Sequence, residues 1–178
     1  MTVLDELIRR NVEFAGLRHD SRLGINPTLN TVIVSCVDPR VDPGVVLQLQ
    51  LGETITVRNL GGRVTPDTLQ TLMMLSRIGQ ANGDAPGPGW NLVLLQHTDC
   101  SIRDLAPFPA LLATYFGVAV QELDRKAIGD PMAAVEGDVL LLQENDSLPS
   151  GLLVSGLVYD VRTGVVEVVM PPDRLGRR

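Results

Sequence analysis

The chain has 178 residues, 44% of them hydrophobic, and a formal net charge of −6. This length and apolar content suit one domain with a real core and argue against disorder. The acidic balance argues against a nucleic-acid-binding surface, and no run reaches the roughly 18 apolar residues of a membrane span. We therefore expect a single cytoplasmic domain over residues 1–178, with no nucleic-acid or membrane partner.

The first predicted element is an amphipathic helix over residues 1–15, in which Leu4, Leu7, Ile8 and Val12 share one face. Short apolar runs that follow it predict buried strands. These runs are 31–35, 54–57, 91–96, 152–159 and 165–170. The last two flank a turn and are expected to pair antiparallel, and residues 171–178 are expected to be a tail.

Helices are expected between these strands. Three of them are predicted to start where a side-chain acceptor precedes a proline, because the acceptor caps the helix and proline has no amide to leave unbonded. These pairs are Asp42-Pro43, Thr65-Pro66 and Asp130-Pro131. The alternation predicts an α/β fold whose sheet has four parallel strands and one antiparallel edge strand, flanked by helices, with an N-terminal helical arm.

Soft metal ligands follow two of the predicted strands. The chain has two cysteines and two histidines. Cys36 ends the first strand, and His97 and Cys100 follow the third. If those strands are parallel neighbours, both thiols and one imidazole meet at one edge of the sheet. Two thiolates and one imidazole suit zinc, and three protein ligands leave a position for water, as in catalytic sites. His19 lies in a polar connection and is interpreted as structural or solvated.

Simpler explanations exist for each ligand taken alone. Cys36 and Cys100 could be buried, inert thiols, or could form a disulfide, although two cysteines in a reducing compartment more often bind metal or act in catalysis. His97 could be a hydrogen-bonded core histidine. The joint placement at strand ends favours the metal site.

Asp38 and Arg40 follow Cys36 at a spacing that allows an ion pair beside the metal. A carboxylate held by arginine stays ionised and keeps one orientation. It could then accept a hydrogen bond from the reacting water. The alternative is a salt bridge that only braces the loop.

At this point the sequence resembles the β-carbonic anhydrases. Their Cys-x-Asp-x-Arg and His-x-x-Cys motifs stand here as Cys36, Asp38, Arg40 and as His97, Cys100. The segments 57–64 and 156–164 are similar to further parts of the family, and the resemblance runs from about residue 10 to about residue 170.

The resemblance implies reversible hydration of carbon dioxide to bicarbonate by a zinc-bound hydroxide. It also implies a homodimer or a dimer-based oligomer, with the N-terminal helix packed on the partner subunit. Asp38 and Arg40 would be the catalytic pair. Asp38 would ligate zinc itself only in a closed state, in which water is displaced.

The sequence departs from the family pattern at several positions. Gln96 and Ser101 stand where glycines are usual, Pro27 replaces a substrate-binding glutamine, and Ile33 replaces a tryptophan of an inhibitory bicarbonate site. Ser101 and Asp104 have the spacing of a capping box, which predicts a helix start. Two alternative functions stay open: hydrolysis of carbonyl sulfide or carbon disulfide on the same site, and a non-catalytic zinc module.

Overall fold

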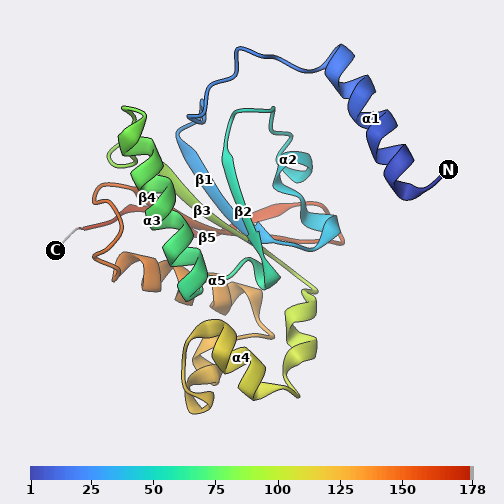
Figure 1. Ribbon diagram of the computed structural model, residues 1–178. Coiled ribbons are helices and arrows are strands. Elements are labelled where there is room, and N and C mark those ends of the chain that lie inside the picture. Colours follow the sequence, from blue (N-terminus) through green and yellow to red (C-terminus); the bar gives the residue numbers. More distant parts are fainter. Residues whose placement is uncertain (177–178) are drawn as a thin grey trace.

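Within residues 1–176, which a computed structural model describes, the strands form one five-stranded sheet in the order β2–β1–β3–β4–β5 (Figure 1). β1 to β4 are parallel, and β5 runs antiparallel to β4. The strands are β1 Thr31–Cys36, β2 Ile55–Asn59, β3 Asn91–His97, β4 Leu153–Tyr159 and β5 Val166–Arg174. The predicted fold class is confirmed, including the single antiparallel edge strand.

The helices begin where the sequence signals predict. In α2, α3 and α5, the side chains of Asp42, Thr65 and Asp130 accept backbone N–H bonds from the first turn, and proline follows each of them. The α-helices of the described residues are α1 Val3–Leu17, α2 Pro43–Val46, α3 Pro66–Ala81, α4 Pro109–Phe116 and α5 Pro131–Gln143. None of them is long and apolar enough to cross a membrane.

α3 and α5 contribute to the main core of the protein. Alternate strand side chains, among them Val34, Leu94 and Val154, pack with Leu72 of α3 and Val139 of α5. Each such side chain contributes about 1.5–3 kcal/mol when it is fully buried. The core therefore holds the strands in register and fixes where the loops at their carboxyl ends begin.

The helix α1 forms an arm that projects away from the sheet (Figure 1). None of its residues is buried, and Leu4, Leu7, Ile8 and Val12 are each more than half exposed. The predicted apolar face is thus present, but it packs on nothing within residues 1–176.

The last strand is longer than expected. β5 continues to Arg174, which pairs with Leu153, and Leu175 is buried. A tail starting at residue 171 is therefore wrong for these positions, and residues 177–178 of it lie outside the described residues. Pro171 and Pro172 cannot donate to a ladder, but an edge strand tolerates proline, so β5 continues through them.

Candidate metal centre

The predicted ligands meet at the carboxyl ends of β1 and β3. These strands are parallel neighbours, with Ser35 beside Leu95, so the chain leaves both at the same edge. Cys36, His97 and Cys100 each offer a ligand atom, and these atoms all lie within 4.8 Å of one another. The two sulfur atoms are 3.8 Å apart and the thiols are free, so no disulfide joins them. His19 is exposed and is not part of this cluster.

His97 is held with one ring nitrogen unused. Its Nδ1 lies 2.8 Å from the carbonyl oxygen of Thr98 and donates to it. Among the described residues, His97 Nε2 is the one buried side-chain nitrogen or oxygen without a hydrogen-bond partner. An unpaired buried polar atom costs about 1–3 kcal/mol, and a metal ion would remove that cost. The orphaned nitrogen beside two thiols therefore fits a metal site.

Backbone amides surround the sulfur of Cys36. The N–H groups of Gly61 and Asp38 point at it over 3.2 and 3.4 Å. The Cys100 thiol lowers the pKa of Cys36, and these amides act in the same direction. Gly62 has a φ of +62°, and a Cβ there would lie 2.9 Å from the backbone nitrogen of Cys36. Only glycine lets this segment approach so closely, and the amides favour the thiolate that a metal requires.

Asp38 and Arg40 form the predicted ion pair. Arg40 Nη2 lies 2.8 Å from Asp38 Oδ2, and Arg40 Nε lies 3.0 Å from Asp38 Oδ1. The arginine lowers the pKa of Asp38 to about 2. The low pKa keeps the Asp38 carboxylate charged. The Asp38 side chain is only 8% exposed, and its ion pair with Arg40 fixes it beside Cys36.

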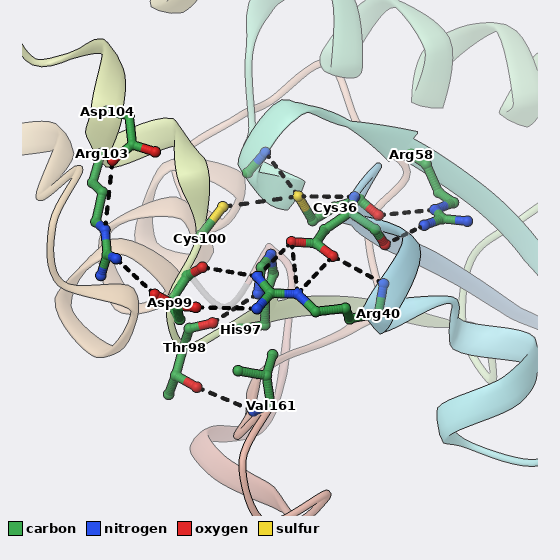
Figure 2. Close-up of polar contacts among 12 residues, drawn as sticks. Cys36, Arg40, Arg58, His97, Thr98, Asp99, Cys100, Arg103, Asp104 and Val161 are labelled. Carbon is green, nitrogen blue, oxygen red and sulfur yellow. Dashed lines mark hydrogen bonds and ion pairs between the residues drawn. The ribbon is translucent and has the colours of Figure 1, made fainter.

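Arg58, at the end of β2, braces the same loop. Its guanidinium donates to the carbonyl oxygens of Cys36 and Asp38, both at 2.8 Å, and to Asp42 Oδ2 at 2.7 Å. Figure 2 shows this side chain reaching the Cys36 loop. Arg58 lies in the segment 57–64, whose resemblance to a known family was noted from the sequence, but its contacts with this loop were not predicted.

Asp99 lies between His97 and Cys100 and was also missed. Its carboxylate accepts hydrogen bonds from Arg40 at 3.0 Å and from Arg103 at 2.6 Å. The expected Ser101–Asp104 capping box is absent. Ser101 instead begins a 3₁₀ turn, Ser101–Leu105, that has no side-chain cap because Cys100 occupies the capping position.

A recess of about 350 Å³, including the space at its mouth, lies beside His97 and Cys100. Gln96, Arg63 and Ile102 are part of its wall. The Gln96 side chain is engaged elsewhere, because its amide donates to Asp138 at 3.1 Å.

Asp138 and Arg63 form a buried ion pair behind this wall. Arg63 Nε lies 2.7 Å from Asp138 Oδ2, and the two side chains are 3% and 2% exposed. The Val64 amide also donates to Asp138, and Arg63 donates to the carbonyl oxygen of Lys126. No sequence pattern announced this pair, since its members are 75 residues apart.

Known proteins resemble the chain over nearly its whole length. No family model matches the sequence. β-Carbonic anhydrase 1 of Mycobacterium tuberculosis is 26% identical over 96% of this chain and 100% of its own length. The solved structure of carbonic anhydrase from Streptococcus mutans is 30% identical, with a TM-score of 0.72 over 95% of this chain and 98% of that one. Coccomyxa β-carbonic anhydrase shares the fold, with a TM-score of 0.73, 18% identity and coverage of 97% and 89%.

Proposed function

Because the chain belongs to the β-carbonic anhydrase family, we propose that it catalyses the reversible hydration of carbon dioxide to bicarbonate and a proton. The observation that carries this proposal is the cluster of Cys36, His97 and Cys100, in which a buried Nε2 has no partner. Asp38 and Arg40 beside the cluster complete the proposed site.

Zinc is the metal that we propose for this site. Two thiolates and one imidazole match its preferred ligands, and three protein ligands leave one position for water. The buried Cys36 and His97 come from different strands, so the complete ligand set exists only in the folded chain. When bound, zinc would supply a water acidic enough to act as a nucleophile near neutral pH.

Asp38 orients the attacking water in this proposal. Since Arg40 holds the pKa of Asp38 at about 2, the carboxylate accepts a hydrogen bond and does not donate one. The remaining lone pair of the water oxygen then faces the carbon of carbon dioxide. A C–O bond forms, one C=O electron pair moves onto its oxygen, the water loses a proton to solvent, and bicarbonate leaves.

Stopped-flow hydration of carbon dioxide, on protein whose metal content is known, tests the function. Arg40→Ala is expected to lower kcat/KM by about 10- to 100-fold, because Asp38 loses the group that orients it. The zinc content should stay near one per chain, because Arg40 is not a ligand.

A matched control is Arg22→Ala, which removes an exposed arginine with the same spacing from its partner, Asp20, outside the site. It should hydrate carbon dioxide at the wild-type rate. If Arg40→Ala hydrates carbon dioxide at the wild-type rate across neutral and alkaline pH, the Asp38–Arg40 pair only stabilises the loop. Zinc-loaded wild-type protein without hydration activity, or with faster turnover of carbonyl sulfide, would refute the proposed function.

We also propose that residues 1–178 are one domain that assembles as a dimer through α1. Leu7 and Ile8 are 57% and 55% exposed on this helix. An apolar helix face without a partner in its own chain marks an interaction surface. A cytoplasmic location stays a prediction, based on thiols that a reducing compartment would keep free.

Light scattering at micromolar concentration is expected to give a dimer. Leu7→Glu combined with Ile8→Glu should shift the protein toward a monomer, because charges replace the apolar contact. Arg10→Glu changes a charge on the same helix and should leave the dimer intact. A wild-type monomer would count against the assembly.

A further inference from the structure

The Arg40 side chain contacts two residues, Asp38 and Asp99, and Asp99 lies between the ligands His97 and Cys100. Besides its contacts with Asp38, its Nη1 donates to Asp99 Oδ2 and its Nη2 donates to the Asp99 carbonyl oxygen, both over 3.0 Å. Figure 2 shows the Arg40 guanidinium reaching the Asp99 segment. Asp99 lies 59 residues from Arg40 in sequence, so this contact joins the loop after β1 to the loop after β3.

The backbone of Asp99 makes this double contact possible. Asp99 has a φ of +56°, in the left-handed region that aspartate tolerates better than most residues. In this conformation both its carbonyl and its carboxylate reach Arg40. Arg103 Nη2 donates to Asp99 Oδ1 at 2.6 Å, which holds the carboxylate from its other side.

Asp38 holds Arg40 only relative to its own loop. The two residues are neighbours in sequence, so their contacts over 2.8 and 3.0 Å do not connect Arg40, whose side chain is 47% exposed, to the segment after β3. Within residues 1–176, the recorded polar partners of the Arg40 side chain are Asp38 and Asp99. Asp99 is thus the one partner that fixes Arg40 relative to His97 and Cys100.

We propose that Asp99 is a positioning residue for the reaction. It anchors Arg40 to the segment between His97 and Cys100, two of the three ligands, and Arg40 in turn keeps the Asp38 carboxylate turned away from the ligand atoms. The expected effect of Asp99 on the reaction rate rests on the proposed function, whereas its expected effect on the orientation of Asp38 does not.

A double-mutant cycle separates this role from a general structural one. Asp99→Gly removes the carboxylate but keeps a residue that accepts positive φ. We expect it to lower kcat/KM by about 10- to 100-fold with one zinc per chain retained. Adding Arg40→Ala should cause no further loss, because both changes disable the same restraint. Asp104→Asn removes a neighbouring charge that does not touch Arg40 and should behave as wild type. Additive losses, or wild-type activity in Asp99→Gly, would overturn the inference.

The visible spectrum of cobalt-substituted protein gives a readout that needs no turnover. Asp99→Gly and Arg40→Ala should share one altered spectrum, since each frees Asp38 to approach the metal, and Asp104→Asn should retain the wild-type spectrum. A wild-type spectrum in Asp99→Gly would refute the positioning role even if the protein hydrated carbon dioxide. If the two variants share the altered spectrum but the wild-type protein does not hydrate carbon dioxide, only the proposed function is refuted.

Discussion

Cys100→Ser is expected to remove most of the zinc from the protein. A serine hydroxyl stays protonated where a thiolate ligates, so two protein ligands would remain. Removing a group that only supports a ligand lowers metal affinity about 10- to 100-fold. Removing a ligand itself should lower zinc affinity by more. Elemental analysis after dialysis against a weak chelator measures the zinc per chain.

The neighbouring residue provides the control. Ser101→Ala changes a hydroxyl beside the same ligand without touching the donor set and should keep one zinc per chain. Cys36→Ser should lose zinc as Cys100→Ser does. Full zinc retention in either cysteine variant would refute the ligand assignment.

Asp138→Asn is expected to lower the free energy of unfolding by about 3–5 kcal/mol, because the Arg63 guanidinium stays buried without a counter-charge. The Arg63 side chain is 3% exposed, so water solvates its charge very little. The loss is a large part of the about 5–15 kcal/mol that holds a typical domain together. Urea unfolding followed through Trp90, the single tryptophan and 4% exposed, measures it.

Two companion variants keep this test decisive if the single variant does not fold. Arg63→Met combined with Asp138→Leu removes both charges and should recover much of the lost stability. Asp20→Asn breaks an exposed pair with Arg22 and should cost less than about 1 kcal/mol. An unfolding midpoint of Asp138→Asn equal to wild type would show that the buried pair contributes nothing.

The sequence alone determined the elements whose causes are local. An acceptor followed by proline favours a helix start through contacts within one turn, so Asp42, Thr65 and Asp130 could be predicted as N-caps from the sequence. The apolar runs predicted the strands for the same reason. The ligand cluster was predicted on the condition that the first and third strands are parallel neighbours, a condition that the pairing of β1 with β3 meets.

The ends of elements were less well determined. β5 extends beyond Met170 because its pairing with β4 and the burial of Leu175 outweigh the breaking tendency of two prolines. Ser101 does not cap a helix, because the chain turns at Cys100, whose side chain faces Cys36. In both places a tertiary contact prevailed over a local preference.

Only the tertiary structure decided which polar side chains support the site. Arg40 meets Asp99 across 59 residues and Arg63 meets Asp138 across 75. The sequence does not show whether a charged side chain is hydrated or is paired with a residue far along the chain. Hydrophobic periodicity says which face of an element is buried, but the identity of a buried charge's partner depends on how separate elements pack, and no local rule encodes that.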